Sequence, residues 1–369
     1  MIREEINEIK KQFNKDTNVI TKYAGCYVDA EKNIKFMTKD AFYSLPEEDA
    51  FKYEEIFRKT LSGAVGKSLL TLDFSIDEEG EDTPHAFLMK LRESRLDDEL
   101  ILDEFFRKVI DAYEYAENYY IILVDMMYDI PGKSSDKLAM DDASNEVYHG
   151  LLCSICPVTL SKPALSYFAN EGVIANRIRD WIVGMPMHGF LFPAFTDRTT
   201  DIHAALYFSK KNDALNESFI NEIIGVNPPM SSVMQKETFE AVLYDVLRDE
   251  LTMPVMSALS SNMLDLIAEN SQNPEPLVLT KNDMVKLISK SGVSDEAVES
   301  YEKSADADIE VLADNVVDTK KFEVKTPGIT VKTDTDSIEK LETRVIDGRK
   351  YLLVPIEDDV EVNGMPVKA

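Results

Sequence analysis

The sequence is short of cysteine, of basic residues and of long apolar runs. It has three scattered cysteines in 369 residues, which do not make the disulfide framework of a small secreted protein. The longest apolar runs, "YYIILV" (119–124) and "GFLFPAF" (189–195), are far below the about 20 residues that a membrane helix needs. The charged start "MIREEI" differs from the apolar region of a signal peptide. These absences predict a soluble protein of the reducing cytoplasm.

Basic residues are outnumbered by acidic ones, 40 against 68, and the formal net charge is −28. Nucleic-acid binding needs a surplus of Lys and Arg to displace counterions from phosphates, so the charge disfavours nucleic acid as a partner. Anionic membrane surfaces are disfavoured for the same reason. The acidity is typical of a soluble protein in a crowded cytoplasm, and it leaves another protein as the expected partner.

The order of elements predicts an α+β fold with a mainly antiparallel sheet. Apolar residues at helical spacing open the chain, and alternating strands then come in pairs, as in residues 19–42 and 119–158. The helices are segregated from these strand pairs instead of alternating with single strands. That order argues against a doubly wound parallel sheet.

We expect three parts along the chain. Residues 1–212 form an α+β body around the antiparallel sheet, and residues 213–305 form a helical region interrupted at "NPP" and "TMP". Residues 306–369 form an acidic linker and a small module of β-hairpins, marked by Pro327-Gly328 and Asp347-Gly348.

The stretch "HGLLCSICPVTLSKP" (149–163) holds two of the three cysteines. A redox pair would place Cys153 at a helix N-terminus, whereas the apolar neighbours predict a buried strand that Pro157 ends. On a strand, Cys153 and Cys156 face opposite sides about 10 Å apart, too far for a disulfide. Buried thiols without a cofactor are the favoured interpretation. The alternative is a zinc site whose four ligands are Cys26, His149, Cys153 and Cys156.

The segment "TDRTTDIH" (196–203) is the densest cluster of groups suited to acid–base chemistry. On an extended chain Asp201 and His203 share a face, where the carboxylate can orient the imidazole and raise its pKa. "RIRDW" (177–181) adds two arginines that suit a carboxylate or phosphate, although an intramolecular ion pair is the favoured interpretation in so acidic a chain. The candidate catalytic residues are therefore Arg177, Arg179, Asp197, Arg198, Asp201 and His203.

Two further patterns fail on geometry. "SGAVGKSLL" (62–70) has Leu61 where a phosphate-binding loop needs glycine, and a predicted helix enters this loop instead of leaving it. Asp125 and Asp129, with Glu146 on the returning strand, resemble an acidic metal centre. About 13 Å of extended chain separates the two aspartates, so one ion cannot bind both without a bend.

Several long motifs together resemble one family. "GCYVDAEKNIKF", "FKYEEIFRKTLSG", "CSICPV", "RIRDWIVGMP" and "IDGRKYLLVPIEDDVEVNG" are similar to bacterial proteins grouped as domain of unknown function 4317, and the resemblance runs from Ile9 to Gly364. It implies a soluble bacterial protein with no assigned reaction, ligand or catalytic residue. Ser68 and His149 depart from the family's pattern, which weighs against the phosphate-loop and zinc hypotheses.

The function that the sequence favours is non-enzymatic binding of another macromolecule, most simply a protein. One alternative is a hydrolase or transferase with a polar site around Arg179, Asp201 and His203. Another is a thiol or zinc protein that uses Cys153 and Cys156. The oligomeric state is not indicated by any of these patterns.

Overall fold

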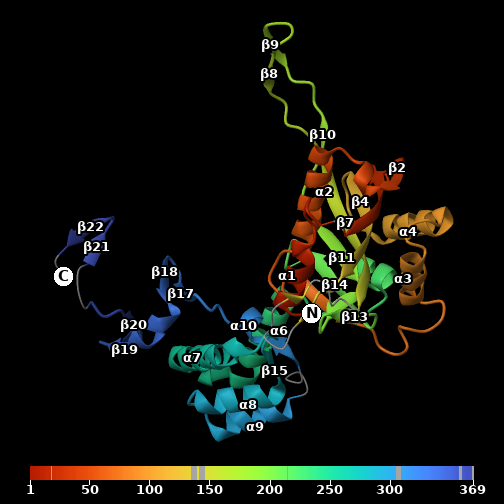
Figure 1. The fold of residues 1–369 in the computed structure, drawn as a ribbon. Coiled ribbons are helices and arrows are strands. Elements are labelled where there is room, and N and C mark those ends of the chain that lie inside the picture. The colour runs from red at the N-terminus through yellow and green to blue at the C-terminus, as the bar shows by residue number, and fades with distance from the viewer. Residues whose placement is uncertain are drawn as a thin grey trace. The chain divides into compact units, whose positions relative to one another are not determined.

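The computed structural model describes residues 1–17, 19–133, 139–140, 146–213, 215–304, 309–356 and 360–367. The chain divides into two compact units, Met1–Ser231 and Ser232–Ala369 (Figure 1). The large antiparallel sheet, the helices and the small hairpins confirm the predicted α+β class. The three-part division expected from the sequence stays a prediction.

The first unit is built on one eight-stranded sheet. Its strand order is β2-β1-β4-β7-β11-β14-β3, with β10 also pairing with β7, and every neighbouring pair is antiparallel. The strands are β1 (Ile20–Val28), β2 (Ile34–Ala41), β3 (Leu69–Asp73), β4 (Tyr119–Asp129), β7 (Val147–Leu160), β10 (Trp181–Val183), β11 (His188–Phe192) and β14 (Ala204–Ser209). Small two-stranded pairs are β5 (Gly132–Lys133) with β6 (Ala139–Met140), β8 (Leu165–Phe168) with β9 (Val173–Asn176), and β12 (Ala194–Thr196) with β13 (Thr199–Asp201).

Helices cover both faces of this sheet, which is why its central strands read as continuous apolar runs. On β4, Ile121 and Leu123 join one core cluster, while Ile122 and Val124 join the other, because successive side chains point to opposite faces. The first face packs against α3 (Pro84–Glu93), α4 (Glu99–Ala112), α5 (Glu217–Phe219) and η3 (Ile220–Ile224). The second packs against α1 (Arg3–Lys11), η1 (Phe42–Ser44) and α2 (Glu47–Thr60).

Strand β7 corrects one expectation from the sequence. It pairs antiparallel with β4 as predicted, but it continues through Pro157 to Leu160 instead of ending there. On its other edge, the pairing with β11 reaches Ile155 and the pairing with β10 begins at Val158. Pro157 falls between the two partners, at a position where no partner strand needs its missing N–H group.

The second unit packs a helical core. Leu243, Leu259, Met284 and Tyr301 are buried together there, and the described residues hold no helix long and apolar enough to cross a membrane. Its elements are α6 (Ser232–Leu247), η4 (Arg248–Glu250), α7 (Met253–Glu269), η5 (Asn270–Gln272), β15 (Val278–Leu279), α8 (Lys281–Lys290), α9 (Asp295–Lys303), β16 (Val311–Leu312) and α10 (Ala313–Val316).

Three β-hairpins follow one another in the last part of the chain; the turns of the first two, at Gly328 and Gly348, are those that the sequence predicts. They are β17 (Lys321–Thr326) with β18 (Ile329–Asp334), β19 (Glu342–Ile346) with β20 (Arg349–Leu353), and β21 (Val360–Val362) with β22 (Met365–Val367), with η6 (Thr335–Lys340) between the first two. Gly328 and Gly348 have positive φ, the conformation that their turns require. Residues 306–308 of the expected linker lie outside the described part of the chain.

Candidate functional site

The three cysteines are free thiols buried inside the first unit. Cys26 and Cys153 belong to the core cluster on one face of the sheet and Cys156 to the cluster on the other, so the expected separation of Cys153 from Cys156 is confirmed. Burial raises the pKa of Cys26 to about 12 and raises the pKa values of the other two thiols as well. A buried neutral thiol is a poor nucleophile and a poor metal ligand.

The four zinc candidates are not gathered around one point. Cys156 lies across the sheet from Cys26 and Cys153, and the Nε2 atom of His149 hydrogen-bonds Asp125 at 2.6 Å. Within the described ranges, no three His, Cys, Asp or Glu side chains are arranged to hold a metal ion.

The 196–203 candidates form a tight hairpin whose polar groups bind α1 and the loop after β3. Asp197 and Arg198 both have positive φ and make the two-residue turn between β12 and β13. The N–H of Asp197 donates to Glu5 at 2.6 Å, and Arg198 forms an ion pair with Glu8 at 2.7 Å. This hairpin therefore fastens the N-terminal helix to the sheet.

Asp201 and His203 do lie close together, but the imidazole has a different partner. The carboxylate of Asp201 accepts a hydrogen bond from the backbone N–H of His203, while Nδ1 of His203 lies 2.7 Å from Glu79. The hydrogen bond between His203 and Glu79 and the charge of Glu79 raise the pKa of His203, whose side chain is 66% exposed. The carboxylate that contacts the His203 imidazole is therefore Glu79, not Asp201 as the sequence suggested.

The arginines of "RIRDW" lie at the other end of β7. Nε of Arg179 donates to the carbonyl of Ser161 at 2.7 Å, and Arg177 is exposed. β10 pairs with β7 up to Leu160, whereas β11, which leads into the 196–203 hairpin, ends opposite Leu151. Nine residues of strand correspond to about 30 Å. The structure does not bring Arg177 and Arg179 together with Asp197, Arg198, Asp201 and His203.

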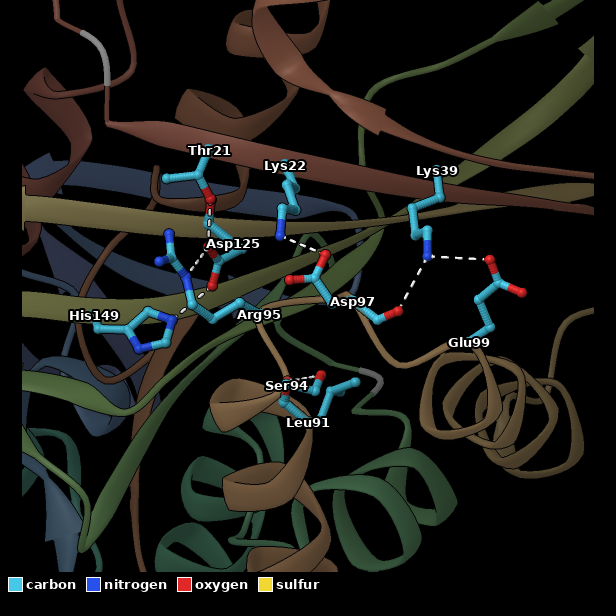
Figure 2. A network of polar contacts seen from close by, with 10 residues as sticks. All are labelled: Thr21, Lys22, Lys39, Leu91, Ser94, Arg95, Asp97, Glu99, Asp125 and His149. Atoms are coloured by element: carbon cyan, nitrogen blue, oxygen red, sulfur yellow. Dashed lines mark hydrogen bonds and ion pairs between the residues drawn. The ribbon is translucent and has the colours of Figure 1, made fainter.

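A charged network does form inside the first unit, around Asp125 (Figure 2). The Asp125 side chain has no exposed surface, and its carboxylate accepts hydrogen bonds from Thr21 and from Nε2 of His149. Nε of Arg95 lies 3.5 Å from a carboxylate oxygen, an ion-pair contact that does not make a hydrogen bond. These partners come from β1, from β7 and from the segment joining α3 to α4.

Burial and hydrogen bonding act in opposite directions on Asp125. Burial raises the pKa of this carboxyl, but the hydrogen bonds from His149 and Thr21 and the charges of His149 and Arg95 outweigh it, so the net pKa lies below the ordinary value. The carboxylate is therefore charged; it faces the guanidinium of Arg95 and accepts hydrogen bonds from Thr21 and His149.

The segment between α3 and α4 is held down by this network. Arg95 and Leu96 both have positive φ, and the side chain of Leu96 is fully buried in the core. Lys22 forms an ion pair with Asp97 at 2.6 Å, and Lys39 bonds the Asp97 carbonyl and Glu99 (Figure 2). Non-glycine residues with positive φ persist where their surroundings hold them, and here the network does so.

Sequence reasoning considered Asp125 and His149 separately and missed their pairing. Asp125 lies opposite Leu151 on β7, which places His149 at the diagonal position on the same face. The available signal was an ionisable residue inside each of two largely apolar strands, Asp125 in β4 and His149 in β7. The pairing fixes the orientation of the His149 ring. Together with the contacts of Arg95 and Thr21, it links the α3–α4 segment to β1, β4 and β7, which is a structural role.

The most exposed apolar part of the first unit is a projection that we call the arm, residues 162–185. It leaves the sheet after β7 and returns through β10, and β8 and β9 project beyond the sheet in Figure 1. Every residue from Ala169 to Val183 is exposed. The arm exposes the large apolar residues Leu165 (69%), Tyr167 (67%), Ile174 (69%), Ile178 (71%), Trp181 (55%), Val173, Ile182, Val183 and Met185.

A groove of about 660 Å³ lies between the chain after α1 and the start of α2. We call it the α2 groove. Its apolar lining is Ile20, Phe42, Tyr43, Leu45, Ala50 and Phe51, and its charged lining includes Glu47, Glu48 and Glu54 with Lys15 and Lys52. Tyr43 and Phe51 are more than half exposed, so the lining of the groove includes exposed aromatic surface.

The comparison with protein families agrees with the resemblance in the sequence. The model described as Domain of unknown function (DUF4317) matches residues 1–365. No curated protein matches the chain. Because the match spans both units of the structure, the chain belongs to the DUF4317 family.

Proposed function

We propose that this protein binds another protein without catalysing a reaction, and that the arm is its contact element. The observation that carries the proposal is the series of exposed apolar side chains on the arm, among them Leu165, Tyr167, Ile174 and Ile178. Contiguous apolar surface of this kind on a soluble chain marks an interaction site, whereas single exposed apolar residues need no explanation.

The construction of the arm supports this proposal. Tyr167 lies opposite Ile174 in the β8–β9 pair, so the two side chains share one face with Leu165, two positions before Tyr167. A two-stranded hairpin is at best marginally stable in water by itself. Burial against a partner contributes about 25 cal/mol per Å² of apolar surface, which stabilises both the contact and the hairpin.

The composition of the arm also suits a protein partner. Tyr, Trp and Arg are the residues enriched where interfaces gain most of their binding energy, and the arm carries Tyr167, Trp181, Arg177 and Arg179. Its three basic residues exceed its two acidic ones, in a chain of net charge −28. The arm is thus a locally basic and apolar element on a strongly acidic protein.

We also propose that the protein works in the cytoplasm of a bacterium. The support is the resemblance in the sequence and the three cysteines, all of which are free thiols in the structure. Cell fractionation with a tagged full-length chain tests the location, and recovery outside the cytoplasmic fraction would contradict it.

The test of protein binding is cross-linking in the native cell, affinity capture of the tagged full-length chain, and mass spectrometry. The arm variant replaces Leu165, Tyr167 and Ile174 with Ser. The control variant replaces Ile76 and Leu100 with Ser, since these side chains are 91% and 83% exposed and lie outside the arm. We expect the wild type and the control to capture the same protein and the arm variant to lose it.

A result against the proposal is equally clear. If the arm variant captures the same proteins in the same amounts as the control, the arm is not the contact element. If no protein is cross-linked to the wild type, including a further copy of the chain, the binding function itself fails.

A further inference from the structure

We infer that the first unit holds a binding site for a quaternary ammonium group, in a pocket between the turn after β1 and Trp181 on β10. This inference goes beyond the proposed function, because it needs none of the apolar side chains of β8 and β9. Three observations carry it: two aromatic walls, the partners that already occupy the other polar groups of the pocket, and the charge that is left over.

The pocket has the size of a small-molecule site. Its volume of about 440 Å³ falls within the range of about 300–1,000 Å³ found for ligand pockets. Its lining includes two aromatic residues, three charged residues and one amide, namely Tyr27, Trp181, Asp29, Glu31, Lys35 and Asn118.

The two aromatic residues lie on the same face of the sheet. Tyr27 is opposite Tyr120, which is opposite Cys156, so these three side chains share one face. Leu160 follows Cys156 by four positions on β7 and therefore points to that face as well. Trp181 lies opposite Leu160. The register of four strands thus brings the indole and the phenol ring to one side of the sheet.

The two rings differ in how they are held. Nδ2 of Asn118 donates to the hydroxyl of Tyr27 at 2.7 Å, which fixes the Tyr27 ring in the pocket. The Trp181 side chain is 55% exposed, and within the described ranges no other ring packs against it and no cation lies over its face. Indole attracts cations more strongly than the other aromatic side chains. The open Trp181 ring is therefore a surface suited to a cation.

Most of the other polar groups in the pocket already have partners. One oxygen of Asp29 accepts the backbone N–H groups of Glu31 and Asn33, at 3.0 and 2.8 Å, and the other lies 2.6 Å from Nζ of Lys35. The side-chain oxygen of Asn118 accepts a backbone N–H at 2.9 Å. A primary ammonium or a sugar would bring N–H or O–H groups that need free acceptors. A quaternary ammonium group has no N–H, so it fits a pocket with few free acceptors.

The charge left in the pocket is negative. Asp29 and Glu31 against Lys35 give a net charge of −1. Because Lys35 is paired with Asp29, Glu31 is the lining carboxylate that makes no ion pair with any described residue. The whole chain carries a net charge of −28, and such a field draws small cations toward the surface.

The first experiment uses Trp181 as its own reporter, since it is the only tryptophan of the chain. The full-length protein is titrated with choline and, separately, with 3,3-dimethylbutan-1-ol, which has the shape of choline without its charge. We expect choline to change the tryptophan emission with a Kd in the millimolar range, and the neutral alcohol to bind at least about tenfold more weakly. Added sodium chloride should weaken choline binding, because Glu31 is exposed and its charge is screened.

Variants locate the site, with binding followed by broadening of the N-methyl proton signal of choline. Trp181→Leu is expected to weaken binding about fivefold or more, and Trp181→Phe, which keeps an aromatic face, to weaken it less. Glu31→Gln is expected to weaken binding about two- to fivefold. Glu55→Gln is the matched control, since Glu55 is exposed on α2 outside the pocket, and it should bind as the wild type does. Circular dichroism checks that each variant has the wild-type fold.

A second titration separates the two sources of such a group. The probe is a short peptide with one trimethyllysine, and the same peptide with unmodified lysine is its control. Binding of the trimethylated peptide at least about tenfold more tightly than choline would assign the site to a modified protein side chain. Equal or weaker binding would assign it to a free quaternary amine.

Three results would overturn the inference. They are the absence of any effect of choline at about 50 mM, equal binding of choline and the neutral alcohol, and unchanged choline binding by Trp181→Leu. The arm variant of the preceding section keeps Trp181 and is expected to bind choline as the wild type does. Loss of arm-dependent protein capture therefore leaves this inference standing, and failure of choline binding leaves the proposed function standing.

Discussion

The charged network and the arm of the first unit are opposite exceptions to the rule that apolar side chains are buried and charged side chains are exposed. The network keeps the charged Asp125 in an apolar interior, and the arm keeps Leu165, Tyr167 and Ile174 in water. The buried carboxylate accepts hydrogen bonds from Thr21 and His149 and faces the guanidinium of Arg95 within the same chain. The arm has no such compensation in its own hairpin, and this difference is what supports the proposed contact with a partner.

The largest expected effect is a difference in thiol reactivity between the buried core of the first unit and the arm. Burial raises the pKa of Cys26 from 9.0 to about 12, which lowers its thiolate fraction near pH 8 by a factor of about 1,000. We expect the natural cysteines to resist iodoacetamide in the folded chain, whereas Tyr167→Cys on the arm reacts at the rate of a free thiol. Mass spectrometry of timed samples measures both rates. Rapid alkylation of Cys153 in the folded chain would contradict its burial and support the thiol hypothesis.

The next largest effect is expected from removing the carboxylate of the network. Asp125→Ala leaves His149, Thr21 and Arg95 without their shared partner, and losing one partner of a buried charged pair typically costs about 3–5 kcal/mol. Urea unfolding followed by circular dichroism gives the free energy of unfolding. Asp103→Ala on α4, whose side chain is 41% exposed and lies outside the network, is the matched control and should change it by less than about 1 kcal/mol. A loss for Asp125→Ala as small as that of the control would show that the network does not stabilise the sheet.

The same network predicts a smaller effect of pH. Because the pKa of Asp125 is lowered in the folded chain, its contribution to stability is present above its ordinary pKa of 3.8 and is lost as the pH falls through the folded pKa. The free energy of unfolding of the wild type should therefore fall more steeply below about pH 4 than that of Asp125→Asn. Parallel pH profiles of the two proteins would contradict this assignment.

The smallest effect on stability is expected in the arm. Leu165→Ser, Tyr167→Ser and Ile174→Ser replace side chains that the body does not bury, so each is expected to change the free energy of unfolding by about 0.5 kcal/mol or less. The measurement is made at protein concentrations low enough to keep the chain monomeric, since association would add to the apparent stability. A loss as large as that of Asp125→Ala would mean that the arm packs on its own body.

Hairpins and turns, which depend on residues close together in the sequence, could be predicted. The partners of the candidate polar residues could not. The hairpin of β1 and β2, the antiparallel return of β7 along β4, and the turns at Gly328 and Gly348 follow from alternation and turn residues. The predicted end of β7 at Pro157 was wrong, because the missing N–H group of a proline ends a strand only where a partner strand needs that group. That need depends on where β11 stops and β10 begins.

The candidate polar residues show the same limit. The strand periodicity placed Cys153 and Cys156 on opposite faces, because that relation depends on three consecutive peptide steps. It could not reveal that Arg179 and His203 lie near opposite ends of β7, because their separation depends on which strands pair beside it. Nor could it pair Asp125 with His149, which requires the register of β4 on β7.

Composition and local pattern alone determined the acidic charge, the α+β class and the small hairpins at the end of the chain. These properties depend on residue counts and on contacts a few positions apart. Only the tertiary structure decided that Asp125 is a buried charge with partners inside the chain, and that residues 162–180 leave the sheet with their apolar side chains in water. The physical reason is that the burial of a strand depends on which distant elements pack against it. Apolar residues of the same types therefore form a core strand in β4 and exposed strands in β8 and β9.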